Sequence, residues 1–142
     1  MNEVTNNKDF THLKIHSQYS ICEGALRTAD LAKFCKNNQI KAVGLCDSNN
    51  LCGALDFSES IAKSKTQPII GIQINIKYKG YIGKIPLFAK DLEGYKNLIK
   101  LSSKSFLEVK DNEEPHCKID DVEKNYKGLI FLTGTFDGLI GK

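Results

Sequence analysis

Residues 41–57 read KAVGLCDSNNLCGALDF, and this stretch decides the fold class that we expect for the chain. It opens with AVGLC (residues 42–46), an unbroken run of small and apolar side chains that is typical of a strand buried on both faces in a parallel sheet. The polar run DSNN (residues 47–50) follows at the carboxyl end of that strand. Because α/β proteins build their sites at this end of their strands, residues 47–50 indicate a site.

The pattern on both sides of this stretch alternates between strands and helices. Upstream, FTHLKIH (residues 10–16) alternates polar with apolar residues and predicts a strand, and Thr28 is expected to cap a helix. Downstream we expect a helix from about 51 to 64, with Asn49 or Asn50 as its cap and an apolar face at 51, 55, 58 and 62. Two strands at 68–78 and 85–89 should follow, joined by a Gly80/Gly83 turn. The remaining elements that we expect are helices at 92–106 and 119–125 and a strand at 129–132. This order predicts a parallel α/β arrangement of about five strands.

Composition places the chain in the class of ordinary globular domains. Its 142 residues are 41% hydrophobic and 26% charged, which fits one soluble domain at residues 10–142 behind a polar, flexible tail at residues 1–9. The net charge of +3 comes from lysine, since Arg27 is the single arginine, so we expect no direct nucleic-acid contact. No stretch approaches the ~20 apolar residues of a membrane span. Five cysteines without a C-x-x-C pair, and no signal peptide, predict reduced thiols in the cytoplasm.

Five blocks of the sequence resemble a known family in both order and spacing. They are similar to the N-terminal PHP (polymerase and histidinol phosphatase) domain of bacterial replicative polymerase alpha subunits, the DNA polymerase III or C-family enzymes. The block EGYKNL at residues 93–98 is associated with these polymerases more than with PHP phosphatases. The five blocks are FTHLKIHSQYSICEGALRTADL, KAVGLCDSNNLCGALDF, PIIGIQINI, LFAKDLEGYKNLIKLSSKSFLE and GLIFLTGTFDGLIGK.

The resemblance implies a distorted β/α barrel of which only the first part is present here. In active members, His, Asp and Glu at the strand ends hold metal ions that activate water for phosphoester hydrolysis. Carried over residue by residue, the family pattern falls on six positions: Lys14, His16, Asp47, Ser48, Gln73 and Lys84. Of these, only His16 and Asp47 keep ligand-type side chains. A protonated lysine has no lone pair and brings a positive charge into a cation site. We therefore expect a degenerate metal site, with no bound metal, no cofactor and no catalytic residue.

Each of these residues has an alternative interpretation. His16 is either a residual ligand or a histidine satisfied by polar neighbours, and Asp47 is either catalytic or a cap of the following helix; we favour the second in both cases. Lys14 and Lys84 either bind phosphate or fill the old metal site with charge, paired with Asp47, which we favour. Cys46 and Cys52 could form a zinc site with His16 and Asp47, although core thiols are the favoured interpretation.

The expected function follows from the resemblance. The chain would be an N-terminal piece of a polymerase alpha subunit that carries no polymerase palm and is itself inactive. Its expected partners are the remainder of the alpha subunit and the proofreading exonuclease subunit. Two alternatives remain, a free-standing metal-dependent PHP phosphoesterase and a non-functional remnant of a split gene.

Overall fold

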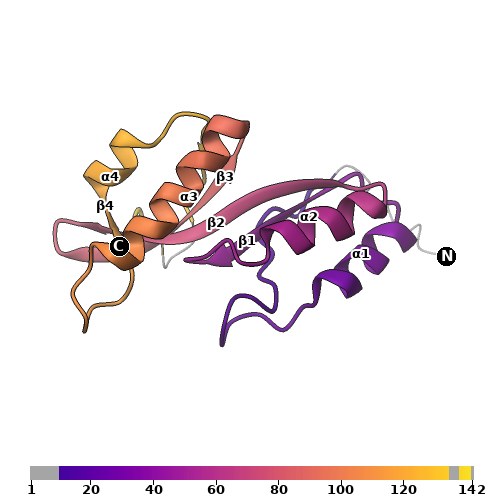
Figure 1. Cartoon of the computed structure of the whole chain (residues 1–142), viewed down its shortest axis with the longest axis horizontal. Helices are drawn as coiled ribbons and strands as arrows, with labels where there is room; N and C mark the ends of the chain where they lie inside the picture. Colours follow the sequence, from indigo (N-terminus) through magenta and orange to yellow (C-terminus); the bar gives the residue numbers. More distant parts are fainter. Residues whose placement is uncertain (1–9, 135–137, 142) are drawn as a thin grey trace.

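The computed structural model describes residues 10–134 and 138–141 (Figure 1). The tail predicted at 1–9 and part of the glycine-rich end therefore lie outside the described residues. In chain order the elements are α1 (Thr28–Asn37), β1 (Ala42–Ser48), α2 (Ala54–Lys63), β2 (Gln67–Tyr78), β3 (Tyr81–Ala89), α3 (Leu92–Leu107), β4 (Cys117–Lys118), α4 (Ile119–Lys124) and β5 (Leu129–Phe131).

The five strands form one mixed sheet, so the predicted α/β class is confirmed, whereas the predicted parallel arrangement holds for only part of the sheet. The main strand order is β1-β2-β3-β5, with β4 beside β2. β1 and β4 run parallel to β2, whereas β2 with β3 and β3 with β5 are antiparallel. Only Lys79 and Gly80 separate β2 from β3, and a parallel connection needs a crossover of a dozen residues or more.

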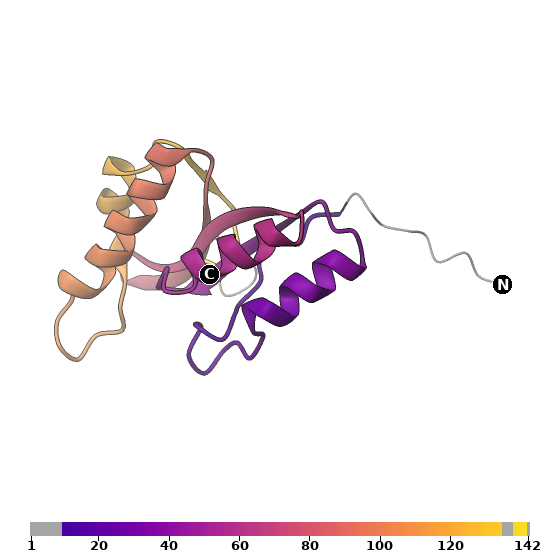
Figure 2. The same ribbon diagram turned by 45° about the vertical axis from the view of Figure 1, so that its right-hand side comes forward.

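Helices gather at two ends of the long strand β2. Figures 1 and 2 show α1 beside α2 at one end and α3 with α4 at the other. α1 and α2 enclose one core cluster against β1, consisting of Leu31, Cys35, Val43, Leu45, Phe57 and Ile61. α3 and α4 enclose the second cluster against β2 and β3, which includes Ile72, Ile74, Ile76, Leu87, Leu98, Leu101 and Val122. No helix in the described part of the chain is long and apolar enough to cross a membrane.

Residues 10–16 do not form the predicted strand but follow the edge of β1 irregularly. The Gly44 amide donates to the His12 carbonyl at 2.7 Å, and the Cys46 amide donates to the Ile15 carbonyl at 2.8 Å. Between these two hydrogen bonds the segment at 10–16 advances by three residues and β1 by two, so the regular pairing is interrupted as it is at a β-bulge. Gly44 permits this approach, because a Cβ there would lie 2.5 Å from the Leu13 carbonyl oxygen.

The two upstream helices begin differently from the prediction. α2 starts at Ala54 with Gly53 as N-cap, and Asn50 instead accepts a hydrogen bond from the Cys52 amide at 3.0 Å. Thr28 lies inside α1, behind the N-cap Arg27, where its hydroxyl donates to Asp56 of α2. Thr28 therefore ties the two helices together instead of capping one.

The buried face of α2 also differs from the prediction. The helix buries Ala54, Phe57 and Ile61, whereas Leu55, predicted on the apolar face, is 71% exposed. The apolar residues on α2 exceed what its buried stripe can hold. The remainder stays on the surface, where it joins apolar residues of β2 and α3 as described below.

Candidate functional site: an ion-paired cluster at Glu23

Three of the predicted site residues meet at a carboxylate that the sequence analysis did not single out. Glu23 Oε1 accepts a hydrogen bond from Lys84 Nζ at 2.8 Å, and its Oε2 accepts one from the Ser48 hydroxyl. His16 Nδ1 lies 3.8 Å from Glu23 Oε2. We call Glu23, His16, Ser48 and Lys84 the Glu23 cluster.

The strands and one loop bring this cluster together. Ser48, at the carboxyl end of β1, is directly opposite Gln73 of β2, and Lys84 of β3 is opposite Asn75, two residues further along β2. Since paired residues and residues two apart share a sheet face, these side chains lie on one face. The loop at 17–24 turns on itself through the hydrogen bond from the Gly24 amide to the Ser20 carbonyl at 2.9 Å, and the contacts of Glu23 with Ser48 and Lys84 hold it against that face.

Asp47 anchors this loop and is wholly occupied in doing so. It is 1% exposed. Its Oδ1 accepts from the Ser17 amide at 2.6 Å and from the Ser20 hydroxyl at 2.7 Å, and its Oδ2 accepts from the Ser17 hydroxyl at 2.8 Å. The prediction that Asp47 caps α2 was wrong, because that helix has no side-chain cap. The favoured pairing with Lys84 was also wrong, since Lys84 bonds Glu23.

The two remaining predicted positions lie outside these contacts. Gln73 is 4% exposed, and within the described structure its Oε1 is a buried acceptor with no hydrogen-bond donor. Lys14 is exposed, and its charge contributes to lowering the pKa of His16. The pairing of Lys14 with Asp47 that we favoured is not formed, because both oxygens of Asp47 accept hydrogen bonds from Ser17 and Ser20.

The charges in the cluster stabilise one another. Partial burial lowers the pKa of His16 below 6.5, an effect that the nearby Glu23 carboxylate opposes. The hydrogen bond from Lys84 is the main cause that lowers the pKa of Glu23, followed by the hydrogen bond from Ser48. The arrangement is therefore a neutral imidazole beside a carboxylate that is held ionised by an ammonium group.

Burial of neutral His16 predicts a pH dependence of stability. Because the folded pKa is depressed, the contribution of His16 is complete above about pH 6.5 and decreases as the pH falls below that value. The folded pKa of Glu23 is also depressed, so its contribution to stability decreases as the pH falls below about 4.5, a lower pH range than that of His16. We expect His16→Gln to flatten the decrease in urea-unfolding free energy between about pH 7.5 and about pH 5.5. His12→Gln is the matched control, and an unchanged slope in His16→Gln would contradict this assignment.

The cysteines give no metal centre among the residues that the structure describes. Cys35, Cys46 and Cys117 are buried, and burial raises the pKa of the Cys46 thiol to about 12, as expected of a core thiol. Cys22 and Cys52 are exposed, so the favoured interpretation as a core thiol is confirmed for Cys46 and was wrong for Cys52. In residues 10–134 and 138–141 no group of three or more His, Cys, Asp or Glu residues is arranged to hold a metal ion.

The comparison with protein families decides the membership of the chain. The family model described as the PHP domain matches residues 12–142. The chain belongs to the PHP domain family. Two solved structures share the fold: a protein assigned as a metal-dependent phosphoesterase from Bifidobacterium adolescentis (TM-score 0.54, 13% identity, 67% of this chain and 32% of that one) and an amidohydrolase from Chromobacterium violaceum (TM-score 0.52, 15% identity, 66% and 34%).

This PHP chain is also similar to much longer curated proteins. It is 38% identical over 135 residues to the DNA polymerase III subunit alpha of Rickettsia conorii and 37% identical over 142 residues to that of Borreliella burgdorferi. The matches include 94% and 92% of this chain but only 11% and 12% of those proteins. The chain therefore spans about a tenth of the length of the curated relatives that it matches.

Sequence reasoning missed Glu23, the carboxylate that His16, Ser48 and Lys84 surround in the Glu23 cluster. One signal was present in the charges, because His16, Lys14 and Lys84 were assigned to one site with Asp47 as the only carboxylate. With Asp47 hydrogen-bonded to serines, the half-buried ammonium group of Lys84 needs another anion as its partner. Glu23 is the acidic residue of the adjoining loop and supplies it.

Proposed function

We propose that this PHP chain is the N-terminal part of a DNA polymerase III alpha subunit and that it serves as a scaffold without hydrolase activity. The similarity to the alpha subunits of Rickettsia and Borreliella supports this assignment. On this proposal, Lys14, His16, Asp47, Ser48, Gln73 and Lys84 are positions of a degenerate metal site. Polymerisation itself belongs to other parts of the alpha subunit.

The single observation that carries the proposal is the bond between Lys84 and Glu23. The ammonium group lies 2.8 Å from the carboxylate on the face where active members of the family hold cations. It thereby supplies to Glu23, the carboxylate of the cluster, the positive charge that a metal ion would bring. A divalent cation bound to Glu23 would lie next to the ammonium group of Lys84, and the repulsion between the two positive charges would disfavour its binding.

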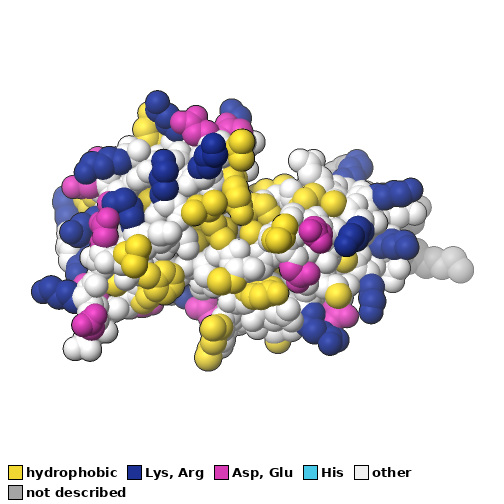
Figure 3. Space-filling view, in the orientation of Figure 1, with side chains coloured by type: hydrophobic (Ala, Val, Ile, Leu, Met, Phe, Trp, Pro, Cys, Tyr) yellow, Lys and Arg dark blue, Asp and Glu magenta, His cyan; other side chains and the backbone are white. Residues whose placement is uncertain are grey.

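The surface features fit a chain that packs against other polypeptides. Among the described residues, β5 pairs with β3 alone, and its Ile130 is 50% exposed. Exposed apolar side chains also lie over the junction of α2 and α3 (Figure 3), where Leu55, Ile70 and Tyr95 line a hollow of about 310 Å³. We infer that the remainder of the alpha subunit covers part of this surface and that the proofreading exonuclease subunit contacts the domain.

Direct contact with nucleic acid is not part of the proposed role. Arg27 is the one residue with a bidentate guanidinium fork. It is engaged by Asp30, with 2.8 Å between Arg27 Nε and Asp30 Oδ2. The chain therefore offers no unengaged guanidinium group for bidentate recognition of a phosphate.

Metal retention distinguishes the scaffold from the free-standing phosphoesterase. After incubation with zinc or manganese and extensive dialysis, we expect the purified chain to retain far less than one metal ion per molecule by mass spectrometry. We also expect no hydrolysis of p-nitrophenyl phosphate above background. Stoichiometric metal together with hydrolysis that His16→Ala abolishes would overturn the proposal. A chain that fails to unfold cooperatively would instead favour the non-functional remnant.

A further inference from the structure

The helix α3 carries a second apolar stripe on the side opposite its buried one. The buried stripe consists of Gly94, Asn97, Leu98, Leu101 and Ser105. On the opposite side, Leu92, Ile99 and Phe106 follow one another at intervals of seven residues and are 68%, 44% and 51% exposed. We call these three residues the outer stripe. A helix that packs on one sheet needs one buried stripe, and apolar residues seven apart form a straight seam for a second helix. The packing within this chain therefore does not explain the outer stripe.

An apolar groove adjoins the outer stripe on the side that faces α2. It consists of two neighbouring hollows of about 310 and 400 Å³, which share Ile70 and Tyr95 in their walls. The exposed Leu55 of α2 borders the first hollow, and Leu92 of the outer stripe borders the second. Figure 3 shows the hydrophobic side chains that gather over this junction of α2 and α3. The outer stripe and the groove thus form one elongated apolar surface, of the kind that marks an interaction site.

Two lysines without a carboxylate partner lie along the other side of the outer stripe. At about 100° per residue, Lys96 and Lys100 are about 60° and 100° from Ile99, away from α2. Within the described structure Lys96 has no hydrogen bond or ion pair, and Lys100 donates only to the neutral Asn97 amide oxygen at 3.4 Å. Glu93 is also on this side, but it lies in the first turn of α3, where the partial positive charge of the helix N-terminus offsets it. The two ammonium groups therefore favour an acidic partner.

We propose that the outer stripe and the groove receive an α-helix from the remainder of the alpha subunit, with apolar residues at heptad spacing and Asp or Glu beside Lys96 and Lys100. The identity of the partner rests on the proposed function. The chain spans about a tenth of the alpha subunits that it matches, so most of such a subunit is available to supply this helix. A twofold pair of copies would present the same patch twice and bring the unpaired lysines of both copies into one interface. This repulsion disfavours a second copy as the occupant.

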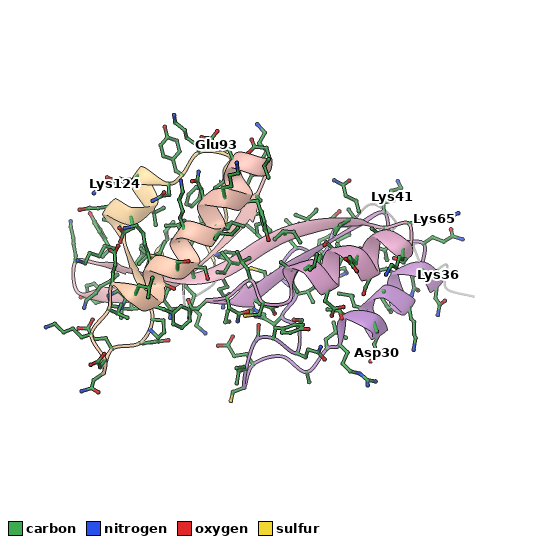
Figure 4. The ribbon with its side chains drawn as sticks, viewed as in Figure 1. Asp30, Lys36, Lys41, Lys65, Glu93 and Lys124 are labelled. Atoms are coloured by element: carbon green, nitrogen blue, oxygen red, sulfur yellow. The ribbon has the colours of Figure 1, made fainter. Side chains whose placement is uncertain are left out.

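Photo-cross-linking in a complete alpha subunit whose N-terminal part is this chain tests the proposal. We expect p-benzoylphenylalanine at Ile99 to link to one peptide outside this chain, and mass spectrometry should identify in it apolar residues at heptad spacing with acidic neighbours. The control position Lys36, at the other end of the molecule in Figure 4, should not link to that peptide. Lys96→Glu should lower the yield at Ile99 at least about threefold, because it places like charges together. Lys36→Glu should leave that yield unchanged.

A third position separates this inference from the proposed function. Ile130 of β5 is half-exposed, and a probe there should link to the remainder of the subunit wherever the chain packs against it. Links from Ile130 but none from Ile99 would overturn the docked helix and leave the scaffold proposal intact, whereas no link from either would contradict both. Links from Ile99 into a second copy, or an unchanged yield in Lys96→Glu, would also overturn the inference. Since Lys96 is exposed, Lys96→Glu should keep the melting temperature of the chain within about 3 °C.

Discussion

Replacing Gly94 by alanine is expected to destabilise the chain by about 3 kcal/mol or more, as overpacking against rigid backbone does. A Cβ at Gly94 would lie 1.9 Å from the carbonyl oxygen of Gly128 and 2.6 Å from its carbonyl carbon. Elsewhere in a helix the same substitution stabilises by about 1 kcal/mol. The sign of the change, measured by urea unfolding, thus reports the contact between α3 and the chain before β5.

Gly94 belongs to a set of contacts that hold residues 127–128 against α3. The Gly128 carbonyl accepts from the Lys90 amide at 2.8 Å, and the Asn97 side chain donates to the Lys127 carbonyl at 2.9 Å. Asp91 caps α3 by accepting from the Gly94 amide at 2.8 Å. This explains in physical terms why the block at residues 93–98 combines a glycine with an asparagine.

The control for Gly94→Ala is Ser103→Ala on the exposed side of the same helix. It should change the free energy of unfolding by no more than about 0.5 kcal/mol. If Gly94→Ala were as stable as the parent chain or more stable, the close approach of Gly128 would be wrong. Both variants place alanine in α3, and of the two only Gly94→Ala adds a Cβ next to the Gly128 backbone.

The fold could be predicted from local patterns where a segment interacts mainly with itself or its neighbour. The run at residues 42–46 became β1, and the span predicted for α3 matches Leu92–Leu107 within one residue. The antiparallel direction of β3 was not predicted, although a turn at Gly80/Gly83 was. The short turn is the local signal for an antiparallel pair, whereas the alternation of helices and strands along the chain indicates parallel strands. The two-residue strand β4 has too few residues to leave a sequence pattern.

The site was harder to predict because its geometry depends on a loop. The resemblance to the PHP family supplied Ser48, Gln73 and Lys84, and the register of the strands places them on one face. Glu23 lies in a loop whose path is fixed by serine hydroxyls and by the positive φ of Cys22 at 65°. Neither feature has a periodicity, so which carboxylate meets Lys84 could not be derived from spacing alone.

That dependence on the loop predicts that Asp47→Ala is strongly destabilising, by about 3 kcal/mol or more. The substitution removes the acceptor of three hydrogen bonds and leaves the buried Ser17 amide and the Ser17 and Ser20 hydroxyls to find new partners. Each buried donor left unsatisfied costs about 1–3 kcal/mol. Urea unfolding at neutral pH measures the loss. Asp30→Ala, which breaks the exposed pair with Arg27, should cost less than about 1 kcal/mol.

The consequence for the Glu23 cluster makes the prediction specific to the loop. Ser20 links the two sites, since its hydroxyl donates to Asp47 and lies 3.2 Å from His16 Nδ1. Once Asp47 no longer holds the loop, Glu23 should lose its fixed place beside Lys84, and the pH dependence assigned to His16 should disappear together with the stability. Equal losses in Asp47→Ala and Asp30→Ala, or an unchanged His16 titration, would mean that Asp47 does not hold the loop. In that case other contacts of the loop, such as the one between Glu23 and Ser48, would have to hold Glu23 beside Lys84.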